Sequence, residues 1–260
     1  MKNKIVHVFK KDKNILIGVI HLPPLVSQMS SPGQSALIEK ALKDLGALEN
    51  AGFDGALLEN DNDKPHTEFA SAAQVESLSG IAHAVVAQAK IPVGVQMMLN
   101  DWMASIDIAK ETGAAFTRLD VFVDHVMCEW GEIHPDPHVI QSYRDKTCPG
   151  LLLLTDIQVK YKTMIETRPL VDSAKEAIVC GSDVIIVTGS ATGVETPTEK
   201  INTVRDSISD FPLFIGAGVD VSNAKMQLAI ADGAIVGTSI KTGDYIDTEK
   251  ATALKKALAA

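Results

Sequence analysis

Six polar side chains stand at or just beyond the ends of short apolar runs: His21, Glu59, Arg118, Asp120, Asp156 and Lys160. Carboxylates and an imidazole can carry protons to and from a substrate, while Arg and Lys can stabilise an enediolate anion. In this scheme Asp156 or Glu59 removes a proton next to a carbonyl group, and His21 is the partner acid. Lys160 is an electrophile (including a Schiff-base former), a phosphate contact or a solvated loop residue. The residue types therefore predict isomerase, epimerase or aldolase-type carbon–carbon lyase chemistry.

Structural alternatives exist for the other members of this set. His21 lies in "GVIHLPPL", where it could hydrogen-bond only the backbone. Glu59 and Asp120 could serve as ion-pair partners of Arg118 rather than as catalytic groups. Asp156 follows four leucines, so its carboxylate needs either a partner or a catalytic role. The sequence leaves these alternatives open.

Three glycine-rich loops follow the last three apolar runs: "TGSATG" (188–193), "GAGVD" (216–220) and "GTSIK" (237–241). Backbone N–H groups that glycine lets approach closely can hold a phosphate dianion with little basic side-chain charge. Barrels that bind phosphorylated ligands often use their last loops in this way. We therefore expect a small phosphorylated ligand, such as a sugar phosphate. The residues predicted to bind it are Thr188, Gly189, Ser190, Gly193, Gly216, Gly218, Gly237, Thr238 and Ser239.

Eight short apolar runs, each followed by a longer amphipathic segment, must position these residues. The predicted strands are 15–20, 54–59, 92–97, 115–120, 151–156, 183–188, 212–217 and 233–238. Near-continuous Val, Ile and Leu content is typical of parallel strands buried on both faces. Eight strand–helix units with right-handed crossovers predict a closed (β/α)8 TIM barrel, with catalytic residues at the C-terminal ends of the strands. An open doubly wound sheet is less compatible, because it usually has fewer units and one glycine-rich turn near its start.

Segments between the strands show two further features. The phrases "NAGFDGALL", "ETGAAFTRL", "VCGSDVIIV" and "IADGAIVG" each contain a glycine that is expected to end a helix before the next strand. The stretch 123–137 shows no regular pattern, so we expect an irregular loop that is a candidate lid.

Composition limits the class of protein. The chain has 260 residues, the usual length of one such barrel, and no linker divides it, so residues 1–260 are expected to form a single domain. With 24 Lys and Arg against 33 Asp and Glu, the formal net charge is −9, which argues against a nucleic-acid partner. No apolar run could span a membrane and no secretory signal opens the chain, so we predict a cytoplasmic protein with reduced cysteines. A homo-oligomer is compatible with the sequence, which does not specify an interface.

The sequence requires no cofactor and leaves a divalent metal as an open alternative. "HPDPH" at 134–138 combines two His with an Asp, but its prolines favour turn or extended backbone and argue against a metal site. Asp61 and Asp63 in "ENDNDKPH" are expected to lie in a solvated loop, because the Gly and bidentate Glu of a calcium loop are missing. The stronger alternative is a metal at the barrel mouth, shared among His21, Glu59, Asp120 and Asp156.

Six phrases in order along the chain resemble the BtpA family: "IGVIHLPPL", "AGFDGALLEND", "PVGVQMMLND", "DVIIVTGSATG", "GAGVDVSNA" and "ADGAIVGTSIK". That family includes a cyanobacterial photosystem I biogenesis protein and SgcQ-like proteins of bacterial sugar-utilisation clusters. The resemblance covers nearly the whole chain and implies a barrel related to ribulose-phosphate-binding folds. The chain departs from the family after Asp156, where "VKYK" replaces an expected Lys-His pair.

Two functions are compatible with these patterns. The first is an enzyme that acts on a small phosphorylated metabolite. The second, implied by the photosystem-linked relative, is a non-catalytic assembly or metabolite-sensing factor built on the same barrel. The set of polar residues at the strand ends favours the enzyme.

Overall fold

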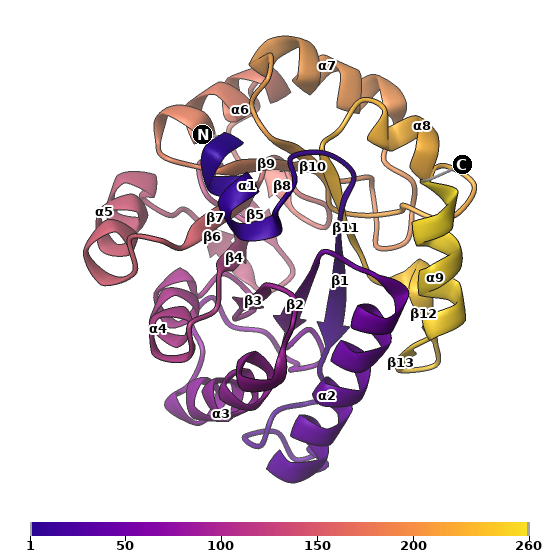
Figure 1. The fold of residues 1–260 in the computed structure, drawn as a ribbon. Helices are drawn as coiled ribbons and strands as arrows, with labels where there is room; N and C mark the ends of the chain where they lie inside the picture. Colours follow the sequence, from indigo (N-terminus) through magenta and orange to yellow (C-terminus); the bar gives the residue numbers. More distant parts are fainter. Residues whose placement is uncertain (1, 259–260) are drawn as a thin grey trace.

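Eight parallel strands close into a barrel in this structure, a computed structural model that describes residues 2–258 (Figure 1). The strand order around the barrel is β1-β2-β3-β4-β7-β9-β10-β11. The strands are β1 (Ile15–His21), β2 (Gly55–Glu59), β3 (Val93–Gln96), β4 (Phe116–Leu119), β7 (Leu152–Asp156), β9 (Val184–Val187), β10 (Leu213–Ile215) and β11 (Gly233–Val236). Each strand overlaps the apolar run predicted for it, and the predicted (β/α)8 barrel is confirmed.

Helices cover the outside of the barrel (Figure 1). They are α2 (Gln34–Ala51), α3 (Ala72–Gln88), α4 (Trp102–Thr112), α5 (Pro137–Thr147), α6 (Leu170–Val179), α7 (Thr198–Ile208), α8 (Ala224–Leu228) and α9 (Thr248–Ala257). Gly52 and Gly113 end α2 and α4 with left-handed φ angles of 76° and 81°, as predicted. The same prediction is wrong for Gly233, which begins β11. A Cβ atom there would lie 2.7 Å from the Phe214 ring, so glycine makes room for that ring.

Side chains alternate between the inside and the outside of the barrel along each strand. Val19 and Leu57 belong to the buried cluster inside the barrel, whereas Ile20 and Leu58 belong to the larger cluster between the strands and the helices. Two residues beyond Val19 and Leu57, the strands β1 and β2 end in His21 and Glu59, which are paired in register. The alternation that builds the inner core therefore also directs these side chains to the C-terminal mouth of the barrel.

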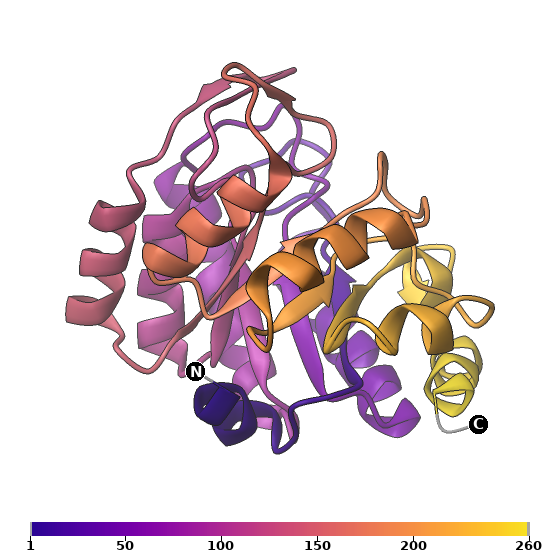
Figure 2. The same cartoon turned by 90° about the horizontal axis from the view of Figure 1, so that it is seen from above.

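The N-terminal helix α1 (Lys2–Phe9) closes the other end of the barrel. Ile5 and Phe9 join the inner cluster, and the Phe9 ring centroid lies 5.5 Å from that of Phe116. Figure 2 shows α1 at one end of the barrel and the segment around residues 120–165 at the opposite end. The end that carries the strand C-termini is therefore not covered by α1.

The stretch 123–137 is not an irregular loop, so that prediction is wrong. The strands β5 (Val126–Cys128) and β6 (Gly131–Ile133) form an antiparallel pair, and β5 also pairs with β8 (Thr163–Met164). Val126 and Ile133 pack with Leu99 and Val121 in a small buried cluster of their own. We call these three strands the mouth sheet. It projects beyond the C-terminal end of the barrel, where Figure 2 shows it above the main body.

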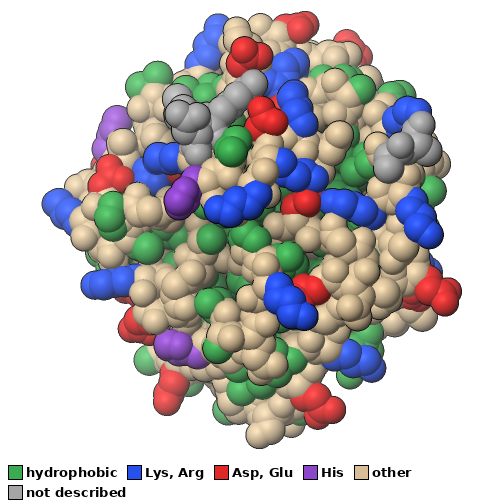
Figure 3. Space-filling model, in the orientation of Figure 1, with side chains coloured by type: hydrophobic (Ala, Val, Ile, Leu, Met, Phe, Trp, Pro, Cys, Tyr) green, Lys and Arg blue, Asp and Glu red, His purple; other side chains and the backbone are tan. Residues whose placement is uncertain are grey.

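A second short antiparallel pair, β12 (Lys241–Thr242) and β13 (Tyr245–Ile246), follows the short 3-10 helix of Thr238–Ile240. The three cysteines are free thiols. Within residues 2–258, no helix is long and apolar enough to cross a membrane. Acidic and basic side chains are interspersed over the face drawn in Figure 3.

Candidate active site

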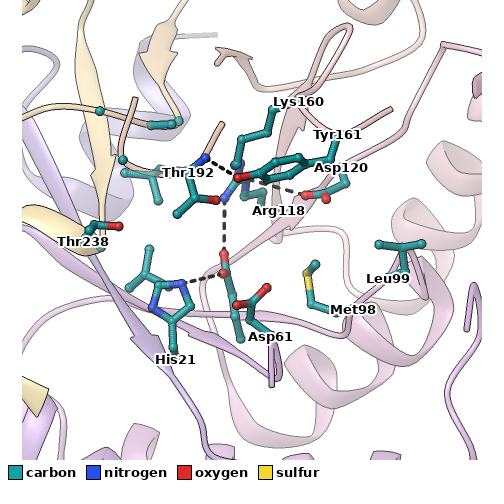
Figure 4. A pocket seen from close by; sticks show the side chains of 18 of the residues that line it. His21, Asp61, Met98, Leu99, Arg118, Asp120, Lys160, Tyr161, Thr192 and Thr238 are labelled. Atoms are coloured by element: carbon teal, nitrogen blue, oxygen red, sulfur yellow. Dashed lines mark hydrogen bonds and ion pairs between the residues drawn. The ribbon is translucent and has the colours of Figure 1, made fainter. Parts of the chain in front are cut away.

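A cavity of about 790 Å³ lies at the C-terminal mouth of the barrel. Thr238, after β11, and Leu99, after β3, lie at opposite ends of it, with His21 and Arg118 between them (Figure 4). The predicted catalytic residues that line the cavity are His21, Glu59, Arg118, Asp120 and Lys160. Five of the six predicted residues therefore line the cavity, and the sixth, Asp156, contacts Arg118.

Arg118, the last inward residue of β4, is the centre of a buried ion-pair network. Its Nε and Nη2 donate to the two carboxylate oxygens of Asp156 at 2.8 and 3.1 Å, and its Nη1 donates to Glu59 Oε1 at 3.3 Å. Asp120 Oδ1 lies 4.0 Å from Arg118 Nε. Burial alone would lower the pKa of Arg118, but Asp156 and the other carboxylates raise it above its usual range. Arg118 is thus a permanent cation that holds carboxylates in place.

Asp156 lies behind Arg118 and does not line the cavity. Its side chain is fully buried, and Arg118 binds both of its oxygens. Burial raises the pKa of Asp156, although Arg118 opposes this shift. Of the two explanations expected for Asp156, a partner or a catalytic role, the structure shows the partner, Arg118.

Glu59 is a cavity carboxyl group that binds a proton more readily than an ordinary Glu. Its oxygens lie 3.3 Å from Arg118 Nη1 and 3.6 Å from His21 Nε2. Burial raises its pKa to about 7, because the loss of hydration outweighs the attraction of Arg118. At neutral pH this carboxyl group can therefore both accept and release a proton.

His21 is neutral at physiological pH. Burial and the nearby Lys241 and Lys40 lower the pKa of His21 to about 3. The ammonium of Lys241, which follows β11, contacts His21 Nδ1. Because an ammonium group can only donate, Nδ1 accepts this hydrogen bond and the proton of the neutral ring is on Nε2, facing Glu59.

Asp120 follows β4 and stays ionised. It accepts hydrogen bonds from Lys162 Nζ at 2.8 Å and from Gln96 Nε2 at 2.9 Å. Burial opposes ionisation, but Lys162 and Arg118 outweigh it and hold the pKa of Asp120 below its usual range. Asp120 and Glu59, two carboxyl groups in the same cavity, therefore differ in protonation because of their neighbours.

The loop after β7 places Lys160 and Tyr161 over the cavity. The Lys160 ammonium has no hydrogen-bond or ion-pair partner among residues 2–258. The hydroxyl of Tyr161 accepts a hydrogen bond from the Thr192 backbone N–H at 2.7 Å, which ties this loop to the glycine-rich loop after β9 (Figure 4). Lys160 is thus a cation of the cavity that a ligand can reach.

Six of the predicted phosphate-binding residues line the cavity: Gly193, Gly216, Gly218, Gly237, Thr238 and Ser239. A Cβ atom on Gly237 would come within 2.8 Å of His21 Cε1, and one on Gly216 within 3.2 Å of Arg118 Nη2. Glycine at these two positions therefore lets the loop backbone approach His21 and Arg118 closely. Ser239 donates to the Val219 carbonyl at 2.7 Å and links the last two loops.

The other three predicted phosphate-binding residues do not line the cavity. Thr188 is buried, and its hydroxyl accepts from the Lys160 N–H at 3.2 Å. Gly189 lies in the glycine-rich loop after β9 and is in close contact with residues that follow this loop. A Cβ atom on Gly189 would lie 2.7 Å from the Val194 carbonyl oxygen. Ser190 is exposed at the start of the loop. This loop therefore reaches the cavity with its later residues.

The two sequence stretches considered for metal binding have other roles. Asp63 is buried and accepts hydrogen bonds from Leu25 N and from two amide side chains, so the expectation of a solvated loop is wrong for this residue. Asp61 lines the cavity. In "HPDPH", Asp136 caps α5 and the His134 ring stacks on His125 at 4.0 Å. No group of three or more His, Cys, Asp or Glu within the described part of the chain is arranged to hold a metal ion.

Several residues in and around the cavity were not singled out from the sequence. Lys162, which lines the cavity, and Lys241, which contacts His21 from outside it, are visible in "VKYK" and "GTSIK", but their partners could not be read there. His66 and Trp130 also line the cavity, and they come from loops without a recognisable motif.

The closed barrel and the polar cavity at its mouth define a (β/α)8-barrel protein with a candidate small-ligand site. The chain belongs to the BtpA family, whose sequence profile matches residues 12–260. An uncharacterised protein of Pyrococcus horikoshii is 32% identical over 248 residues, 93% of this chain and 94% of that protein. Photosystem I biogenesis protein BtpA of Synechocystis sp. is 30% identical over 253 residues, 95% of this chain and 88% of that protein. Thiamine phosphate pyrophosphorylase of Pyrococcus furiosus has a similar fold, with a TM-score of 0.59 at 13% identity over 95% of this chain and 96% of that chain.

Proposed function

We propose that this protein is an enzyme that moves a proton on a small phosphorylated carbonyl compound, with sugar phosphates as the favoured substrate class. Glu59 carries the proposal: it lines the cavity, lies between Arg118 and His21, and has a pKa of about 7. A group with such a pKa is an effective base and acid at neutral pH.

The neighbours of Glu59 supply the other parts of this reaction. Glu59 takes the proton from the carbon next to the carbonyl group, and the electron pair of that C–H bond forms an enediolate. The Nε2–H of His21 and the ammonium of Lys160 are donors for the negative oxygen. Return of the proton to the neighbouring carbon, together with transfer of the hydroxyl proton to the former carbonyl oxygen, completes an isomerisation. An aldolase-type lyase would form the same type of anion by breaking a carbon–carbon bond and releasing an aldehyde. Arg118 is a positioning residue, because each of its three nitrogens already donates to a carboxylate.

The glycine-rich loops support binding of the phosphate group. Gly193, Gly218 and Thr238 line the cavity, and Thr238 lies at the end away from Leu99 (Figure 4). A phosphate held there would position the rest of the ligand over Glu59 and His21, so binding energy far from the reacting carbon would orient it.

Hydrogen–deuterium exchange tests the proton transfer without knowledge of the product. Aldose and ketose phosphates are incubated with the protein in D2O, and proton NMR follows the C–H next to the carbonyl group. We expect Glu59→Gln to slow exchange by about 10²–10⁴-fold while ligand binding is kept. Glu132→Gln is the matched control, because Glu132 is exposed on the mouth sheet and pairs with His125. The proposed reaction would be refuted if the unchanged protein exchanged no bound sugar phosphate faster than the Glu59→Gln variant does.

Thr238 tests the phosphate site separately. Thr238→Glu adds a negative charge at the glycine-rich loops and is expected to weaken binding of sugar phosphates by about tenfold or more. Thr238→Gln adds a neutral side chain of similar size and serves as the control. Equal affinities of the two variants would contradict a phosphate at this position.

The alternative function is supported by the name of the Synechocystis relative, a photosystem I biogenesis protein. On that account the same cavity binds a phosphorylated metabolite without converting it. Binding that depends on Thr238, together with no exchange by the unchanged protein, would favour this non-catalytic function.

A further inference from the structure

The end of the cavity around Leu99 has no role in the proton transfer proposed above. Met98 and Leu99 form an apolar wall there, and Figure 4 places them across the cavity from Thr238. Trp130, on the turn between β5 and β6, also lines the cavity, and 37% of its surface is exposed. The Leu99 N–H donates to the Thr67 carbonyl at 3.1 Å, and the ring of the adjacent His66 contacts the Trp130 ring, so Trp130 lies near this wall. A partly exposed indole near an apolar wall is a suitable surface for a flat ring.

His66 provides a second, independent indication of a ligand at this end. It lines the cavity, only 8% of its surface is exposed, and its ring meets the Trp130 ring edge to face at a centroid distance of 5.9 Å. The Nδ1 atom of His66 is buried and has no hydrogen-bond partner within residues 2–258. Burial lowers the pKa of His66, so the ring is neutral and offers one donor and one acceptor. Buried polar groups in proteins are nearly always hydrogen-bonded, so the imidazole of His66 is a candidate partner for a polar atom of a ligand at this end.

The size and charge of the cavity narrow the class of ligand. Pockets for small molecules span roughly 300–1,000 Å³, so a cavity of about 790 Å³ accommodates more than a short sugar phosphate. Asp61, Lys64 and Glu129 also line the cavity and carry charges of both signs. These mixed charges do not select for a positively or negatively charged group, so the group bound near Trp130 can be neutral.

We propose that this end of the cavity is a second subsite that binds a planar heteroaromatic ring carried by the phosphorylated sugar. The ring packs against Trp130 and the Met98–Leu99 wall, and one of its polar atoms hydrogen-bonds His66. The sugar then lies over Glu59 and His21, and the phosphate reaches the glycine-rich loops. This inference rests on the proposed function for the position of the phosphate.

Tryptophan fluorescence can test the subsite directly, because the chain has only two tryptophans. Trp102 is buried in α4 against Tyr143, so Trp102→Phe leaves Trp130 as the reporter. The probes are uridine and adenosine 5′-monophosphates, ribose 5-phosphate, uridine, and phenyl riboside 5-phosphate. We expect saturable changes in Trp130 emission with the ring-bearing phosphates, and dissociation constants about tenfold lower than that of ribose 5-phosphate.

Substitutions separate stacking from hydrogen bonding, with affinities measured by calorimetry. Trp130→Ala is expected to remove the roughly tenfold advantage of every ring-bearing phosphate. His66→Phe should weaken nucleotide binding by about fivefold and leave the phenyl compound unaffected, because phenyl has no polar ring atom. Met127→Ala is the matched control: Met127 neighbours Cys128 on β5 and is exposed, but it does not line the cavity.

Each outcome has a distinct meaning. The second subsite would be overturned if ribose 5-phosphate bound as tightly as the ring-bearing phosphates and Trp130→Ala changed none of these affinities. The phosphate site would then remain supported. Uridine that binds as tightly as its monophosphate, in a manner dependent on Trp130, would support the subsite and overturn the proposed phosphate site. No binding of any probe would overturn both.

Discussion

Replacing Glu59 by Gln is expected to stabilise the fold at about pH 8 and to change its stability little at about pH 5. Glu59 is almost completely buried, and burial raises its pKa from 4.5 to about 7. The folded protein therefore keeps a proton on Glu59 in a pH range where the unfolded chain has lost it. Gln resembles the protonated carboxyl group in shape and never ionises.

The sign and size of the effect follow from proton linkage. Between the unfolded pKa of 4.5 and the folded pKa of about 7, the folded state binds more protons, so the stability of the unchanged protein falls as pH rises. Above that range the loss is complete and corresponds to roughly 3 kcal/mol, at about 1.4 kcal/mol per pH unit. At about pH 5 the difference should be below about 1 kcal/mol.

Urea unfolding of the unchanged protein and the variant at both pH values measures this difference. Asp120→Asn is the contrasting control, because Lys162 and Arg118 hold the pKa of Asp120 below its usual range. Its ionised form stabilises the fold above its unfolded pKa of 3.8, so Asp120→Asn should destabilise at both pH values. If Glu59→Gln destabilised the protein equally at both pH values, the assignment of a raised pKa to Glu59 would be wrong.

Three further predictions concern other contacts. Asp156→Asn removes the buried bidentate partner of Arg118 and should lower the free energy of unfolding by about 3–5 kcal/mol in calorimetry; a loss below about 1 kcal/mol would contradict the central role of this pair. Lys241→Met removes the donor to His21 Nδ1 and a nearby positive charge, so the pKa of His21 should rise. ¹⁵N NMR of the His21 ring should also show a changed tautomer equilibrium, and unchanged ring shifts would disprove this contact. Gly46→Ala in α2 places a methyl group where no atom lies within 4 Å, and thermal unfolding should show a gain of up to about 1 kcal/mol, whereas a loss would indicate an unseen clash.

The barrel strands could be predicted because their composition is a local property. Parallel strands covered on both faces need near-continuous apolar residues, and runs such as 151–156 and 183–188 show them plainly. Once the strands are known, alternation places His21 and Glu59 on the inner side at the same end. The glycine-rich loops after the last strands could also be recognised, because their composition is likewise a property of adjacent residues.

The mouth sheet could not be predicted in this way. Its strands have two or three residues each, too few to show a periodic pattern, and β5 pairs with β8 across more than 30 residues of chain. Asp63 was misjudged for a related reason: its polar neighbours suggest a solvated loop, while its hydrogen bonds to Leu25 and Gln74 come from distant segments.

By itself the sequence determined the barrel, the polar residues at its mouth and the glycine-rich loops, because strand composition and loop chemistry are written in adjacent residues. Only the tertiary structure decided which carboxyl group lines the cavity and which is enclosed behind it. Asp156 is held by Arg118 behind the cavity, while Glu59 lines the cavity with a pKa of about 7. His21 and Lys241 meet although they are 220 residues apart. Burial and charge at a site depend on neighbours in space, so protonation states became clear only when the strands closed into a barrel.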